Sequence, residues 1–201
     1  MDDVSDTVFR QIVADCAPPD LFFTEFVNVD GLQSPGREKL LPKLRLTEKE
    51  KPIIAQIWGK DPANYYKTVK DLIAMGYEGV DINMGCPDRA VVKNGCCSAL
   101  INNRELAGEI IQATKAAAGN DFPVSVKTRV GFTTIDLSWI EFLLQQKLNM
   151  LTIHARTTKE MSKVPAHYEL FEQIVALRDK LSPTTLIVAN GDITSRSGGV
   201  A

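Results

Sequence analysis

A cysteine held between a glycine and a proline is the residue of this chain best suited to chemistry. Cys86 follows an apolar run at residues 79–83, and its neighbours Gly85 and Pro87 are foreign to the interior of a helix or strand. A turn of this kind after a strand predicts a thiol that projects into a central cavity. This position disfavours the alternative of a buried structural cysteine and leaves a functional thiol open.

The elements that must position this cysteine are short apolar runs alternating with helical patterns. The runs cover residues 21–27, 52–58, 79–83, 123–128, 149–154 and 185–190. They lack polar alternation, which is typical of parallel strands buried on both faces. Helical patterns cover residues 5–16, 62–75, 100–118, 135–146 and 167–181, with Ser5 and Asp61 as expected caps. Residues 29–51 are predicted to be a polar loop holding at most a short hairpin or helix.

This alternation predicts an α/β fold with a parallel sheet and right-handed crossovers. An open doubly wound sheet and a TIM (β/α)8 barrel both fit. The dinucleotide-binding form of the open sheet is disfavoured because no G-x-G-x-x-G follows the first strand. Polar residues near the ends of nearly all strands favour the barrel, whose active site is built from all the βα loops. These residues are Glu25, Gln56, Asn83, Lys127, His154 and Asn190.

The strand count predicts that residues 1–201 are one partial barrel domain. A barrel has eight strands in typically about 250 residues, whereas this chain shows six apolar runs in 201 residues. The simplest arrangement makes them strands two to seven. We therefore expect a fragment, with strand one ending before Met1 and strand eight following Ala201.

The composition is that of an ordinary globular protein, with 44% hydrophobic and 24% charged residues and a net charge of −2. No apolar stretch reaches the roughly 18 residues of a membrane span, and no signal peptide is recognisable. We therefore expect a cytoplasmic protein with no membrane partner. The four cysteines form no C-x-x-C and the two histidines are distant from them, so we predict no metal site.

The segment DINMGCPDRAVVKNGCCSAL at residues 81–100 resembles the signature of the tRNA-dihydrouridine synthase family. Other segments resemble further motifs of that family in the same order, at residues 1–10, 24–27, 55–59, 126–131, 154–157 and 190–193. The resemblance spans essentially the whole chain. It implies a monomeric, FMN-binding TIM barrel that reduces uridine in tRNA, with NADPH as reductant. The family's C-terminal helical tRNA-binding domain would lie beyond Ala201.

The resemblance also implies roles for individual residues. Cys86 would donate a proton to uracil while reduced flavin supplies the hydride. Lys127 would stabilise negative charge on the reduced flavin ring. The other implied cofactor contacts are Met1, Gln56, His154, Asn190, Gly191 and Asp192, the last three forming half of a phosphate-binding turn. The implied substrate contacts are Asn83, Arg129 and Arg156. Cys96 and Cys97 are interpreted as packing residues.

Basic residues in the predicted βα segments would attract a polyanion such as tRNA. They are Lys60, Arg89, Lys93, Lys127, Arg129, Arg156, Lys159 and Lys163. Two other functions stay open. One is an FMN-dependent barrel like dihydroorotate or dihydropyrimidine dehydrogenase, acting on a free pyrimidine. The other is a truncated, non-catalytic RNA-binding fragment. The Met-Gly-Cys-Pro turn and the basic residues favour the tRNA enzyme.

Overall fold

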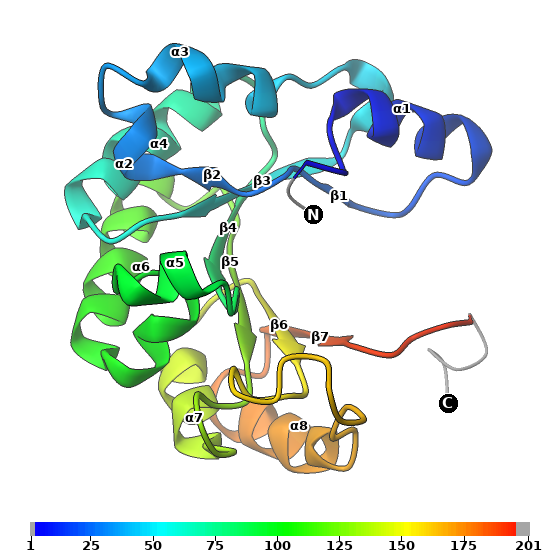
Figure 1. The fold of residues 1–201 in the computed structure, drawn as a ribbon, viewed down its shortest axis with the longest axis vertical. Helices are drawn as coiled ribbons and strands as arrows, with labels where there is room; N and C mark the ends of the chain where they lie inside the picture. Colours follow the sequence, from blue (N-terminus) through cyan, green and yellow to red (C-terminus); the bar gives the residue numbers. More distant parts are fainter. Residues whose placement is uncertain (1–2, 196–201) are drawn as a thin grey trace. The chain divides into compact units, whose positions relative to one another are not determined.

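The computed structural model describes residues 3–195, which alternate between strands and helices (Figure 1). The strands are β1 (Phe22–Phe23), β2 (Val27–Asn28), β3 (Ile53–Trp58), β4 (Val80–Met84), β5 (Val124–Arg129), β6 (Met150–His154) and β7 (Leu186–Asn190). Their order in the sheet is β1-β3-β4-β5-β6-β7, and β2 also pairs with β3. An order that simply follows the chain has no switch point, so it fits a barrel and not a doubly wound sheet. The predicted α/β barrel class is confirmed.

The helices occupy the intervals between these strands. They are α1 (Thr7–Cys16), α2 (Val29–Leu32), α3 (Arg37–Leu40), α4 (Pro62–Ala74), α5 (Arg89–Lys93), α6 (Arg104–Ala118), α7 (Leu137–Gln145) and α8 (Leu170–Leu181), with 3-10 helices η1 (Leu41–Leu44), η2 (Glu48–Glu50) and η3 (Cys97–Asn102). The predicted loop at residues 29–51 thus contains α2, α3, η1 and η2. Local capping explains part of this regular structure, because Thr47 and Glu50 form a capping box at the start of η2.

Two helix starts differ from prediction. The cap of α1 is Asp6 rather than Ser5, since the Asp6 carboxylate accepts the Phe9 amide at 2.8 Å. The pattern at residues 100–118 divides into η3 and α6, because Asn103 adopts a non-helical φ of −134° between them. Asp61 caps α4 as predicted.

The chain divides into two compact units. Unit one comprises residues 1–83 and 105–125, and unit two comprises residues 84–104 and 126–201, so β4 and β5 contribute residues to both. The core of unit one forms where β3 and β4 meet buried faces of α4 and α6. In α4, for example, Tyr65, Val69 and Leu72 are all fully buried, at the spacing of one helix face.

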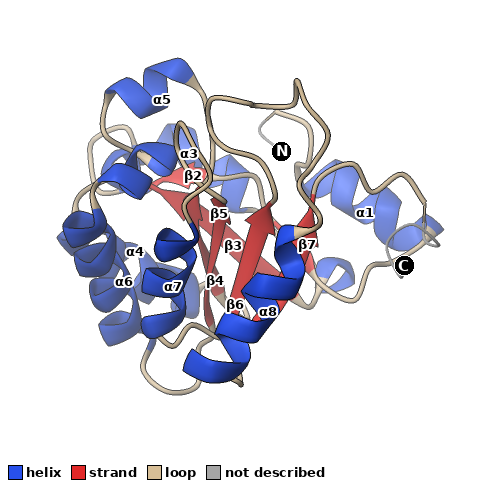
Figure 2. Cartoon of the chain, turned by 90° about the horizontal axis from the view of Figure 1, so that it is seen from below, coloured by secondary structure: helices blue, strands red, loops and turns tan. Residues whose placement is uncertain are grey.

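In unit two, α7 and α8 lie side by side (Figure 2). The core side of α7 carries Trp139, Ile140 and Leu143, which are all 0% exposed. The strand β7 departs from the expected burial, since Leu186 and Val188, which share one face of the strand, are 63% and 39% exposed. Within residues 3–195 its strand neighbour is β6 alone, which leaves these side chains uncovered. No helix in the described range is long and apolar enough to cross a membrane.

Candidate active site

The turn that carries Cys86 is braced through the backbone carbonyls of the two residues before it. In unit two, Thr128 Oγ1 donates to the carbonyl of Met84 at 3.2 Å. Arg129 Nε donates to the carbonyl of Gly85 at 2.8 Å. Both donors come from the end of β5, so the strand fixes the path of the chain into the cysteine.

Two further contacts complete the bracing. The amide of Ser98 donates to the carbonyl of Cys86 itself at 3.3 Å. A Cβ on Gly85 would lie 3.2 Å from the carbonyl carbon of Thr128, so any other residue would push the turn slightly away from β5. Three successive carbonyls are therefore held in place, and the cysteine side chain carried by this turn is partly exposed.

Arg129 joins this turn to the loop after β6. Its side chain is 6% exposed, and it also donates from Nη1 to the carbonyls of Thr157 at 3.1 Å and Met161 at 2.9 Å. Burial lowers the pKa of Arg129, but an arginine stays charged at any physiological pH. The predicted substrate contact is thus an arginine whose hydrogen bonds hold protein backbone.

A tryptophan that the sequence did not single out supports the same turn. Trp139 Nε1, from the buried side of α7, donates to Thr128 Oγ1 at 2.9 Å. The Thr128 hydroxyl can then direct its own proton toward the carbonyl of Met84. The chain of contacts from α7 to the cysteine turn explains why a polar threonine is fully buried at this position.

Arg156 is the centre of a second buried cluster in unit two. It is 4% exposed, and its Nη2 contacts both carboxylate oxygens of Asp192, at 2.6 and 2.5 Å. Its Nε donates to the carbonyl of Val164 at 2.6 Å, and its Nη1 lies 3.0 Å from Nε2 of His154. Because arginine can only donate, Nε2 of His154 must accept, which places the imidazole proton on Nδ1.

The surroundings of His154 keep its imidazole uncharged. Burial, followed by the positive charges of Arg129, Lys127 and Arg156, lowers the pKa of His154 to about 4. The negative charge of Asp192 acts in the opposite direction and does not compensate. At neutral pH this strand-end histidine is therefore a neutral hydrogen-bonding group.

The turn after β7 requires its glycine. Gly191 has a φ of +117°, and a Cβ there would lie 3.0 Å from Cδ2 of His154. Asp192 follows with a φ of +51° and accepts the amide of Ala166 at 2.9 Å. The hydrogen bond from Arg156 is the main cause that lowers the pKa of Asp192. Its carboxylate thus anchors the turn from within.

Unit one contains a separate relay of polar side chains carried by β3, β4 and β5. Ser125 Oγ donates to Oδ1 of Asp81 at 2.6 Å, and Gln56 Nε2 donates to Oδ2 at 2.7 Å. Asn83 Nδ2 in turn donates to Oε1 of Gln56 at 3.0 Å. Asp81 is 1% exposed, and it sets which way the Gln56 amide faces. Sequence reasoning quoted Asp81 within its motif but gave it no role.

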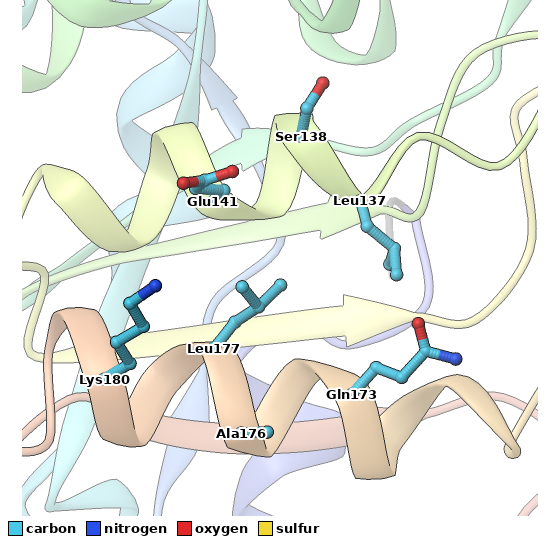
Figure 3. A pocket seen from close by; sticks show the side chains of 7 residues that line it. All are labelled: Leu137, Ser138, Glu141, Gln173, Ala176, Leu177 and Lys180. Carbon is cyan, nitrogen blue, oxygen red and sulfur yellow. The ribbon is translucent and has the colours of Figure 1, made fainter.

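A groove of about 490 Å³ lies elsewhere in unit two, between α7 and α8 (Figure 3). It is lined by Leu137, Ser138 and Glu141 of α7 and by Gln173, Leu177 and Lys180 of α8. None of these residues belongs to the strand-end groups described above. The candidate site therefore remains with the strand-end side chains.

A comparison with protein-family models decides the family. The model described as dihydrouridine synthase (Dus) matches residues 1–199. The chain belongs to the dihydrouridine synthase family. The predicted resemblance is confirmed over almost its whole length.

Comparison with individual proteins gives the same family. The chain is 47% identical over 203 aligned residues to the "Probable tRNA-dihydrouridine synthase" of Staphylococcus aureus (strain COL), covering 100% of this chain and 61% of the relative. It is 46% identical over 203 residues to the "Probable tRNA-dihydrouridine synthase 2" of Bacillus subtilis (strain 168), covering 100% of this chain and 62% of that protein. The chain thus spans about three fifths of the length of these relatives.

Among solved structures, the chain resembles histamine dehydrogenase from Rhizobium sp. 4-9. The TM-score is 0.66 at 14% sequence identity, with 94% of this chain and 38% of the other covered. At this level of identity the likeness concerns the fold, and it agrees with the strand order described above.

Most of the residues implied by the family signature fall within unit two. The implied residues in unit two are Cys86, Lys127, Arg129, His154, Arg156, Asn190, Gly191 and Asp192. Gln56 and Asn83 belong to unit one, whereas Met1 lies outside the described residues.

The predicted set of basic residues needs one correction. Arg129 and Arg156 are buried and bonded to protein groups, so they do not present their donors to solvent. Lys127 is partly exposed. The exposed members of the set are Lys60, Arg89, Lys93, Lys159 and Lys163.

Proposed function

We propose that the protein reduces uridine to 5,6-dihydrouridine in tRNA, with FMN as cofactor and NADPH as its reductant. The observation that carries this proposal is the braced turn presenting Cys86 within a chain of the dihydrouridine synthase family. The relatives from Staphylococcus aureus and Bacillus subtilis carry the names of tRNA-dihydrouridine synthases. Because this chain spans only 61% of the first of them, the activity is proposed for the full-length protein.

The donors present in unit two are suited to a flavin phosphate and ring. Gly191 exposes backbone where a side chain could not fit, which lets a ligand approach the turn after β7 closely. Lys127 would hold the ring's negative charge, and neutral His154 would add a hydrogen bond without a second charge. Asn190 would add a further cofactor contact within this unit. Bound FMN, once reduced, would supply a hydride to C6 of the uracil ring.

Cys86 would supply the proton that balances this hydride. Its S–H bond breaks as a C5–H bond forms, so the C5=C6 double bond becomes saturated at both ends. The resulting thiolate regains a proton from solvent, to which the side chain is partly exposed. The bracing fixes the backbone of the turn that carries the sulfur, and a positioned donor is what proton transfer in a transition state requires.

The test compares cysteine variants of the full-length protein. Unmodified tRNA is mixed anaerobically with pre-reduced enzyme, and flavin reoxidation is followed together with the mass of the digested nucleosides. Cys86→Ala should slow uridine reduction by about 10²-fold or more, the usual loss for a general acid. Reduction of the flavin of Cys86→Ala by NADPH should be nearly unchanged.

Cys96→Ala and Cys97→Ser are the matched controls. Both thiols are buried, and burial raises the pKa of Cys97, so neither should act as an acid. We expect each to change turnover by less than about threefold, as small packing changes do. Wild-type reoxidation in Cys86→Ala, with a stall in either control, would overturn the assignment.

The same full-length protein can be used to distinguish the proposed function from the two alternatives. Reduction of free orotate or uracil in place of tRNA would indicate a dehydrogenase of free pyrimidines. Protein that binds tRNA but purifies without flavin, and takes none up, would indicate a non-catalytic RNA-binding protein.

A further inference from the structure

The edge of the sheet in unit one contains a β-bulge beside Gln56. Phe23 of β1 pairs with Ile54 of β3, and Val27 of β2 pairs with Ile57 of β3. The chain therefore advances four residues from β1 to β2 while β3 advances three. The extra residue falls within residues 24–26. Bulges of this kind redirect a side chain and recur next to active sites.

Thr24 fixes the backbone of this bulge. Its Oγ1 accepts the amide of Gln56 at 3.0 Å, replacing the carbonyl that would normally pair there. The same hydroxyl donates to the carbonyl of Glu25 at 2.7 Å. The amide of Thr24 meanwhile pairs with Ile54 at 3.0 Å. The position of Glu25 is therefore set by the sheet.

Glu25 is buried in a way that the local structure does not satisfy. The residue is 3% exposed, and its Oε1 has no hydrogen-bond partner among residues 3–195. A buried carboxylate oxygen without a donor carries its full desolvation cost, so such groups usually serve a ligand or a function.

Another buried glutamate of unit one shows the contrast. Glu50 is 0% exposed and receives donors from Arg10 at 2.6 Å, from the Thr7 hydroxyl at 2.6 Å and from the Thr47 amide at 3.0 Å. The fold thus satisfies the glutamate that has a structural role. The unpaired oxygen of Glu25 lies on the residue that follows the Thr24–Gln56 link.

We propose that Glu25 is a ligand-binding residue whose carboxylate accepts the N–H of a cyclic imide. An imide N–H lies between two carbonyls, so it needs one acceptor with donors nearby. In the same unit, the Gln56 amide uses one N–H on Asp81, and its second N–H can be such a donor. This inference rests on the proposed function, in which the flavin ring and uracil each carry one imide N–H at N3.

The experiment measures binding by the full-length apoprotein and needs no turnover. FMN and N3-methyl-FMN, which lacks the imide proton, are titrated by flavin fluorescence against wild type, Glu25→Met and Glu25→Gln. If the flavin is the partner, wild type should favour FMN by about tenfold, the scale of one such hydrogen bond. Glu25→Met should lose this preference, and Glu25→Gln, which keeps an acceptor, should retain part of it.

The second arm tests uracil as the partner. Uridine and N3-methyluridine are titrated against holoenzyme, and the shift of the flavin absorbance band reports binding. A preference for uridine that Glu25→Met abolishes, with FMN affinity unchanged, assigns the carboxylate to the substrate. Equal affinities of Glu25→Met and wild type in both arms would overturn the proposal.

Stability measurements separate a structural role from a binding role. Glu25→Met should unfold at the same or higher urea concentration than wild type, because it removes an unsatisfied buried group. A clear loss of stability without loss of either imide preference would also count against a ligand contact. Wild type that binds FMN with imide preference but reduces no tRNA would refute the proposed function while upholding the role of Glu25. Failure to bind either ring would refute both.

Discussion

Replacing Arg129 with methionine should loosen the turn that carries Cys86. The substitution keeps an unbranched apolar stem but removes the donors to the carbonyls of Gly85, Thr157 and Met161. Met161 is 44% exposed, so its carbonyl can bond to water instead. The other two acceptors belong to buried residues and would lose the guanidinium as their donor.

The expected cost follows from those two acceptors. Each buried carbonyl that loses its donor costs about 1–3 kcal/mol. Removing the guanidinium also removes the desolvation cost of burying its charge, which offsets part of that loss. We therefore expect Arg129→Met to lower the free energy of unfolding by about 2–4 kcal/mol. Arg104→Met is the matched control, because Arg104 is 39% exposed and pairs with Asp136 at the surface. Such exposed pairs contribute at most about 1 kcal/mol.

Two measurements check the prediction. Urea unfolding gives the stability of each variant. The reaction of the Cys86 thiol with a disulfide reagent, in a Cys16→Ser background, reports the local opening of the turn. Cys16 is the exposed cysteine, and Cys96 and Cys97 are buried, so the background isolates the signal. Labelling should accelerate by about tenfold for each ~1.4 kcal/mol of easier opening. The reasoning fails if Arg129→Met and Arg104→Met match in both measurements.

Three further outcomes follow from the contacts described above. The imidazole of His154, followed by NMR, should titrate with a pKa of about 4 and carry its proton on Nδ1. Since an unfolded histidine titrates near pH ~6.5, the unfolded state binds more protons between those values. Stability should fall as the pH drops through that window, and titration near its ordinary pKa would contradict the assignment. Lys127→Ala and Asn190→Ala should each lower the FMN content of purified full-length protein, and unchanged content in both would count against the proposed cofactor contacts. Glu50→Gln should cost about 3–5 kcal/mol in urea unfolding because it leaves buried Arg10 poorly paired, whereas a cost below 1 kcal/mol would refute a structural role.

The fold was predictable because its strands are short, apolar and evenly separated by helical patterns. Burial on both faces leaves a continuous run of large side chains, as in β4, where all five residues are buried. The same logic failed for β7, because an apolar run does not reveal whether neighbouring elements are present to cover it. The short helices of residues 29–51 were missed since their order depends on caps and tertiary contacts more than on periodicity.

The sequence allowed a prediction of which residues form the candidate site, but not of the contacts that these residues make. Strand-end positions identified Cys86, Lys127 and His154 because parallel strands bring their carboxyl ends to one edge. Strand-end position also drew attention to Glu25, but the bulge that buries it has no sequence signal, since it consists of one extra residue between two strands only two residues long. Trp139 looks like any other core residue of an amphipathic helix, and only its Nε1 contact reveals its support of Thr128.

The two buried arginines show why residue type and position do not determine a role. Arg156 is paired with the carboxylate of Asp192, so most of its charge is compensated. The hydrogen bonds of Arg129 instead go to neutral carbonyls, and its positive charge interacts with the thiolate form of Cys86. A thiolate is what Cys86 becomes after it gives up its proton. Arg129 can therefore assist the proposed proton transfer in two ways without touching the substrate: it holds the turn in place, and it stabilises the charge that the transfer leaves behind.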